Sequence, residues 1–212
     1  MQDRRKFLAT TASSLAALGV VGQASADDAK VTKEEINQAA VRGNERNGST
    51  GVKRELMSLG LNPDVTTDTL GSDDVVSPDR IYGDPSSSDS ELTVSVSDNY
   101  QDDYVYVSVT MDLKSDKYII RNSWWCDDAI GIGFNKSDWA AMGEPAVSAT
   151  TEHDAGFTAQ NVSDDALAGT VDIKRQDLDF EGAILPDATV SLTGEFKLRE
   201  GGEPTTLWGT YS

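Results

Sequence analysis

The feature that most constrains the fold is a strict alternation of apolar and polar residues in the second half of the chain. In 105–113, every odd position holds Val, Met or Leu, and the positions between hold Tyr, Ser, Thr and Asp. The same period of two runs through 92–97 and 190–198. Successive side chains of a β-strand point to opposite faces, so this pattern predicts strands with one apolar face.

Further short apolar segments between residues 91 and 212 bring the expected number of strands to about nine, with turn-rich segments between them. A series of short strands of this kind is typical of two packed antiparallel sheets. We therefore predict a mainly β fold. It is a single antiparallel β-sandwich, immunoglobulin-like or jelly-roll-like, over residues 91–212.

A short N-terminal helical segment is expected over residues 27–61. Thr32 and Glu35 have the spacing of a capping box, and Gly60 is placed to end a helix. Two short helices, 33–42 and 53–59, are predicted on either side of an Asn-, Gly- and Ser-rich loop. With such thin apolar faces they would not be stable alone, and we expect them to pack on an end or edge of the sandwich.

Residues 62–90 show little periodicity and are rich in Asp, Ser, Thr, Gly and Pro. This composition is typical of a connector between folded parts. The sequence thus predicts four parts, which are an N-terminal signal (1–26), the helical segment (27–61), the connector (62–90) and the sandwich (91–212).

The first 26 residues have the pattern of a twin-arginine export signal. An arginine pair precedes Phe and Leu, a mildly apolar run follows, and small residues occupy the positions that a signal peptidase reads. The residues that carry this pattern are Arg4, Arg5, Phe7, Leu8, Ala24 and Ala26. The pattern predicts transport by the twin-arginine machinery and an extracellular mature chain that begins near Asp27.

The apolar run of the signal is too short and too polar for a permanent membrane span, which needs about 20 mostly apolar residues. No second apolar run of that length follows it. We therefore expect no membrane span in the mature chain. With Cys126 as the one cysteine, an intramolecular disulfide is excluded.

The chain is strongly acidic, with 36 acidic and 18 basic residues. Asp3 is the one acidic residue before Asp27, and Arg4, Arg5 and Lys6 are the basic ones. The expected mature chain therefore keeps 35 acidic and 15 basic residues, a net charge of −20. Such self-repulsion is tolerable where salt screens it. Nucleic acid is not an expected partner, because phosphate binding needs clustered Lys and Arg.

The signal and the Asp-rich, Lys-poor mature chain together resemble the secreted, β-rich proteins of halophilic archaea. The resemblance rests on the signal and on composition alone. It implies secretion into a medium of high salt, and it brings no functional residues with it.

Three of the four tryptophans lie within 16 residues, at Trp124, Trp125 and Trp139. Tryptophan offers a large, rigid contact area, so one reading of the cluster is a platform for a glycan or a partner protein. The other reading is a core tryptophan with partly covered neighbours. Nearby, Gly131 and Gly133 match half of a phosphate-binding loop, but the helix and lysine that such a loop requires do not follow.

Cys126 and the single histidine, His153, suggest a second hypothesis, a small secreted hydrolase or thiol enzyme. A nucleophilic thiol needs a base within hydrogen-bond reach and a third group such as Asp128 to orient that base. Neighbouring carboxylates raise the pKa of a thiol and so disfavour the thiolate. We therefore expect a non-catalytic extracellular module that binds a protein or a glycan at or near the cell surface, with the enzyme as the alternative.

Calcium is the one cofactor that the acidic loops suggest. It takes six to eight oxygen ligands, which the loops of a sandwich can supply. The best local cluster is Asp98, Asn99, Asp102 and Asp103. It does not have the regular spacing of a known calcium loop, and acidic pairs are common by chance in so acidic a chain.

Overall fold

The computed structural model describes residues 6–11, 31–69, 90–98, 104–113, 128–151, 155–173, 176–178, 182–184 and 187–211. It confirms a mainly β fold of antiparallel sheets with a helical segment. The elements in chain order are β1 (Lys6–Thr11), α1 (Lys33–Ser58), β2 (Asn62–Thr69), β3 (Glu91–Asp98), β4 (Tyr104–Leu113), β5 (Asp128–Gly133), β6 (Trp139–Ala141), β7 (Ala146–Thr151), β8 (Ala155–Val162), β9 (Ala166–Ile173), β10 (Gln176–Leu178), β11 (Gly182–Ile184), β12 (Ala188–Leu198) and β13 (Thr206–Tyr211).

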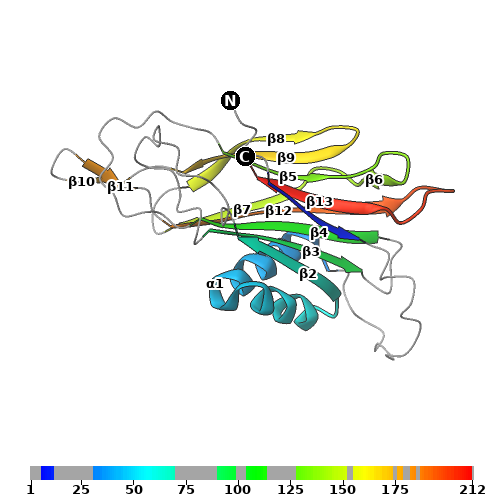
Figure 1. The fold of residues 1–212 in the computed structure, drawn as a ribbon, viewed down its shortest axis with the longest axis horizontal. Helices are drawn as coiled ribbons and strands as arrows, with labels where there is room; N and C mark the ends of the chain where they lie inside the picture. The colour runs from blue at the N-terminus through cyan, green and yellow to red at the C-terminus, as the bar shows by residue number, and fades with distance from the viewer. Residues whose placement is uncertain are drawn as a thin grey trace.

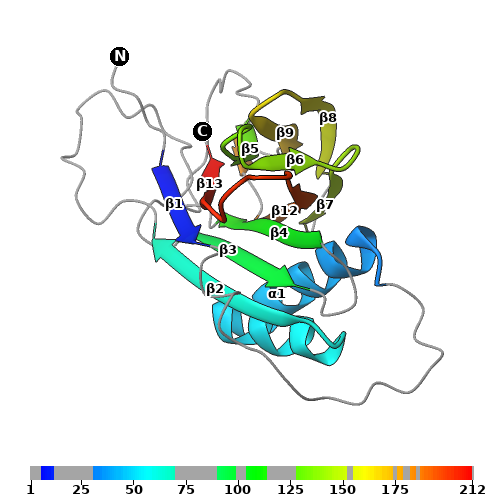
Figure 2. The same ribbon diagram turned by 90° about the vertical axis from the view of Figure 1, so that its right-hand side faces the viewer.

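The strands form two large sheets. Sheet A has the order β1-β13-β5-β9-β8. Sheet B has the order β2-β3-β4-β12-β6, and β7 also pairs with β12. A small hairpin, β10-β11, lies apart from both. Figures 1 and 2 show three layers, with sheet A on one side of sheet B and α1 on the other. The helical segment thus covers a face of the sandwich rather than an end or edge.

The main core lies between the two sheets. Val94, Val109 and Leu192 of sheet B are fully buried there with Ile132 and Leu207 of sheet A. These are the apolar positions of the alternating segments, so the predicted period places them on the inner faces as expected. A Cβ atom on Gly209 of β13 would lie 2.5 Å from a methyl carbon of Val94, which shows how closely the sheets approach there.

The polar face of sheet B is buried as well. The alternating segments predict that the residues between the apolar ones face away from the core, and in many antiparallel sheets that face is wet. Here it lies under α1 and is lined with hydroxyl groups. Its buried Ser and Thr members on the central strands are Thr93, Ser95, Ser97, Ser108, Thr110, Thr189, Ser191 and Thr193, and we call them the hydroxyl layer.

Asn37 of α1 connects the helix to the hydroxyl layer. Its side-chain amide N–H groups donate to Ser191 Oγ at 3.1 Å, to Thr193 Oγ1 at 3.0 Å and to the Ala146 carbonyl at 3.3 Å. Its amide oxygen accepts from the hydroxyl of Ser148. Because Asn37 is 1% exposed, these bonds replace the water that the groups would otherwise contact.

Helix α1 begins and ends as the sequence predicts. The Thr32 backbone N–H donates to the Glu35 carboxylate at 2.9 Å, and the Glu35 N–H donates to Thr32 Oγ1 at 3.2 Å, which completes the capping box. At the other end Gly60 has φ +79°, and backbone N–H groups of Gly60 and Leu61 bond back to Met57 and Leu56. This is the Schellman pattern. In the described residues, no helix is both long and apolar enough to cross a bilayer.

The predicted loop between the two helices is wrong for most of its length. Only Asn47 and Gly48 leave helical geometry, so α1 is a tight pair of helices joined at a kink. Gly43 and Gly51 lie where the two halves touch. A Cβ on Gly51 would come 2.0 Å from the Gly43 carbonyl oxygen, and one on Gly43 would come 2.5 Å from Val52 Cα. These glycines permit the backbones of the two halves to touch, although the Asn-, Gly- and Ser-rich composition of this segment is typical of a loop.

The predicted connector is also wrong in its first part, because residues 62–69 form β2. This strand pairs with β3 along its whole length, from Asn62 opposite Asp98 to Thr69 opposite Glu91. As an edge strand it tolerates Pro63 and carries the exposed residues Asp64 and Asp68. The sandwich therefore begins before residue 91.

Gly51→Ala is expected to destabilise the protein by about 1–3 kcal/mol, because the added methyl meets backbone that no rotamer change can move. Unfolding by denaturant in high salt, followed by circular dichroism, measures this loss. Lys53→Ala is the matched control, since Lys53 is exposed two residues further along the same helix. Equal stability of the two variants would contradict the glycine contact.

Asn37→Leu is expected to cost at least about 2 kcal/mol of stability. Leu has a similar size, but it leaves the hydroxyls of Ser191, Thr193 and Ser148 without their shared partner in a buried layer. The same change at the adjacent exposed Gln38 should alter stability by less than about 0.5 kcal/mol. Thermal unfolding of both variants tests this, and a neutral Asn37→Leu would contradict it.

Candidate functional site

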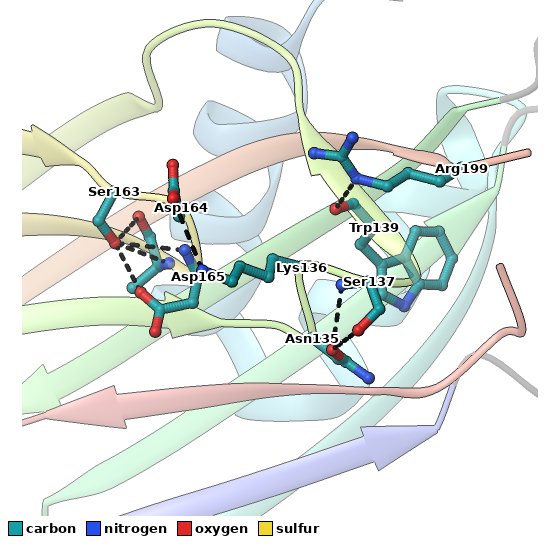
Figure 3. A network of polar contacts seen from close by, with 9 residues as sticks. Asn135, Lys136, Ser137, Trp139, Ser163, Asp164, Asp165 and Arg199 are labelled. Carbon is teal, nitrogen blue, oxygen red and sulfur yellow. Dashed lines mark hydrogen bonds and ion pairs between the residues drawn. The ribbon is translucent and has the colours of Figure 1, made fainter.

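Trp139 is the one residue of the predicted tryptophan platform that the structure describes, and it lies in the core. It is 2% exposed at the start of β6. Its indole N–H donates to the Thr205 carbonyl at 3.2 Å, and Arg199 Nε donates to the Trp139 carbonyl at 3.1 Å. Figure 3 shows the Trp139 ring and the Arg199 side chain at this contact. The ring is therefore not available for stacking on a ligand.

Asp138, the neighbour of Trp139, connects the loop between β5 and β6 to the loop between β12 and β13. Its carboxylate accepts from Asn135 Nδ2 and from Thr205 Oγ1, both at 2.7 Å. Its carbonyl accepts from the Arg199 N–H at 2.7 Å. These groups satisfy one another by hydrogen bonds, so the two loops hold each other in place without a ligand.

The turn between β8 and β9 is closed in a similar way. The Ser163 hydroxyl donates to Asp165 at 2.9 Å and accepts from the Ala166 N–H at 2.9 Å (Figure 3). Lys136 and Asp164 lie 3.7 Å apart across this end, and both side chains are well exposed. An exposed pair of this kind contributes little to stability or to binding.

The residues of the thiol-enzyme hypothesis are not placed. Cys126 and His153 lie outside the described residues, as do Trp124 and Trp125. Asp128 begins β5, where its backbone pairs opposite Val171, and its side chain is not described. The described residues therefore do not test this set, and the hypothesis stays a prediction.

The predicted signal lies partly within the described residues. Phe7 and Leu8 belong to β1, which pairs with β13. The other residues of the pattern, Arg4, Arg5, Ala24 and Ala26, lie outside the described residues. A role of this segment in export stays a prediction.

Asp98 is the described member of the predicted calcium cluster, and Asn99, Asp102 and Asp103 lie outside the described residues. Asp98 ends β3, opposite Asn62 and Val105. Its Oδ1 atom is buried and has no hydrogen-bond partner. Burial raises the pKa of the carboxyl, and a hydrogen bond from its own backbone N–H lowers it by less. Among the described residues, no group of three or more acidic, His or Cys side chains could hold a metal ion.

The outer face of sheet A carries the feature that sequence reasoning missed. Trp208 of β13 is partly exposed there and lies against Gly133 of β5, its cross-strand neighbour. A Cβ on Gly133 would lie 2.2 Å from the Cε2 and Nε1 atoms of the indole. In the next row Thr210 lies opposite Gly131, and its methyl would be 3.3 Å from a Cβ there. The two glycines make room for the side chains of β13.

This surface continues across β9 as small residues. The six residues that form it are Trp208, Thr210, Gly131, Gly133, Ala166 and Ala168, and we call it the Trp208 face. None of them is charged. It therefore offers a rigid aromatic contact and a hydroxyl, without a group suited to acid–base chemistry at neutral pH. The Gly-x-Gly pair within a strand was the available signal, because glycine there often marks close approach.

Asp98→Asn is expected to stabilise the protein at pH 7. A raised pKa in the folded state means that folding favours the protonated carboxyl. The contribution of the Asp98 carboxyl to the free energy of unfolding is therefore fully present below about pH 4, and it is lost as the pH rises through the folded-state pKa. The gain from Asn should therefore shrink toward pH 4.

Midpoints of thermal unfolding measured between pH 3 and 7 in constant salt test this. Asp64→Asn on the neighbouring strand removes one exposed negative charge and is the matched control. The same pH dependence in both variants would show that net charge, rather than burial of Asp98, is responsible.

No protein-family model matches the chain, and no curated protein is similar to it in sequence. Fold does not supply the missing function, because two-sheet sandwiches host many unrelated activities. The Trp208 face and the charge of the chain are therefore the features that bear on function.

Proposed function

We propose that the chain is an exported, non-catalytic binding module whose Trp208 face contacts a protein or glycan at or near the cell surface in high salt. The observation that carries the proposal is the partly exposed indole of Trp208, held against Gly133 in an uncharged part of a highly acidic protein. Large aromatic side chains held rigidly at a surface dominate many binding interfaces.

Electrostatics favour this face over the rest of the surface. At 1 M salt the Debye length is about 3 Å, so ion pairs between exposed groups lose most of their strength. A partner that is also acidic would be repelled by most of the surface, because the chain carries 36 acidic residues against 18 basic ones. An aromatic, uncharged contact keeps its strength under both conditions.

Export is the second part of the proposal. The twin-arginine pattern would direct the folded chain out of the cell, and a signal peptidase would then hydrolyse the peptide bond after Ala26. The resulting chain, 27–212, would keep α1, sheet B and every strand of sheet A except β1. Both parts are consistent with an acidic surface adapted to brine.

The test is capture of cell envelopes and of spent medium from the producing organism by immobilised protein, in its own salt. Trp208→Ala should weaken capture of the bound component at least about tenfold, which is about 1.4 kcal/mol. Val162→Ala is the matched control, since Val162 is 51% exposed at the edge of the same sheet. Capture that is equal for the wild type and both variants would contradict a binding role for the Trp208 face.

A further inference from the structure

Sheet A is completed by a strand that the proposed processing would remove. Strand β1 pairs antiparallel with β13 over six residues, from Lys6 opposite Tyr211 to Thr11 opposite Thr206. Strand β1 also lies against β2 and β3, so it closes one side of the sandwich (Figure 2). All six residues precede Ala26, the last residue of the predicted signal.

Loss of β1 would open one edge of β13. The backbone N–H and C=O groups of residues 206–211 that face β1 would lose their partners, while the opposite side of β13 would stay paired with β5. Unpaired edge groups are a ready template for another strand.

Two other edges of the sandwich carry features that discourage pairing. At one edge of sheet B, β2 exposes Asp64 and Asp68. At the far edge of sheet A, the ladder between β8 and β9 has an irregularity between Phe157 and Ala159. Charges and bulges at an edge both oppose addition of a strand. In contrast, β13 has no charged residue over Thr206–Tyr211.

We propose that β13, once β1 is removed, pairs antiparallel with β13 of a second copy. The mature protein is then a two-fold dimer with one continuous sheet through both molecules. This inference rests on the proposed function only in that processing after Ala26 removes β1 in the cell.

Three observations favour a second copy as the occupant. The position is filled in the structure by an extended antiparallel strand, so it is shaped for polypeptide rather than for a glycan. Each molecule has a net charge of −20, so the two repel each other. Because β13 is uncharged, no charges of like sign face each other at the contact. Antiparallel pairing of one edge with its own copy satisfies both open edges at once and closes the assembly.

The experiment starts from the full chain, with a specific protease site placed between residues 12 and 26. The uncut protein should have the mass of a 22.7 kDa monomer in size-exclusion chromatography with light scattering in high salt. After cutting and removal of the released peptide, the mass should double relative to the shortened chain. In hydrogen exchange, amides of residues 206–211 should stay protected in the dimer.

A synthetic peptide of residues 4–13 should return the dimer to monomers when added in excess, because it takes the same edge. The control peptide has Pro in place of Leu8 and Ala9, which removes a ladder donor on each side of the strand, and it should have no effect. Near-ultraviolet circular dichroism shows whether the cut protein stays folded.

Four results would overturn the proposal. The first is a folded monomer whose amides in 206–211 exchange rapidly, and the second is a dimer that the synthetic peptide does not dissociate. The other two are a released N-terminal fragment that cannot be removed from the cut protein, and unfolding of the protein after that fragment is removed. The export proposal fails separately, if mass spectrometry of the native protein finds its N-terminus intact.

Discussion

The structure depends on the burial of both faces of sheet B. The central strands β3, β4 and β12 supply apolar side chains to the main core on one face and the hydroxyl layer on the other. A buried hydroxyl without a partner costs about 1–3 kcal/mol, so the layer requires groups that match it. Asn37 supplies several of them, and pairs such as Ser108 with Thr193 at 2.7 Å satisfy others across the strands.

This requirement explains why the buried face of α1 combines small residues and amides with a few larger apolar residues such as Ile36 and Leu56. A helix that covers hydroxyl groups needs small residues and a few amides rather than a broad stripe of leucine. Ala39, Ala40 and Asn44 are all buried at this interface, and Thr93 donates to the Asn44 amide oxygen at 3.5 Å. Within the layer, the hydroxyl oxygens of Ser95 and Ser97 are buried without a protein partner. Bound water is the usual way in which such groups are satisfied.

Much of the fold could be predicted because local signals agree with it. The period of two placed β3, β4 and β12, and the pairing of Thr32 with Glu35 placed the start of α1. What the period could not show is that the polar face is covered. The available clue was its chemistry, since most of its members are Ser and Thr in a chain rich in Asp and Glu. Strand β2 was missed because Asn62, Pro63 and Asp64 are typical of a turn, and an edge strand tolerates them.

The site was harder to predict, because its parts are distant in sequence. Trp208 and Gly133 are 75 positions apart, and only the register of β13 on β5 brings them together. The tryptophans that are clustered in sequence give the stronger local signal, yet Trp139 lies in the core. A cluster along the chain indicates a site only where the fold keeps it at the surface.

The N-terminal strand raises the same issue in a sharper form, because under the proposed function one segment would have two uses at different times. A signal must be extended and accessible to the export machinery and to the peptidase, whereas β1 is paired with β13. A strand of six residues at the edge of a sheet is held by one neighbour in its own sheet, so it can leave at less cost than a central strand such as β4. Its position at the edge is therefore compatible with both the proposed export role and the observed pairing. Under the proposed function it would cover β13 until the chain is processed, and its release would leave β13 paired with β5.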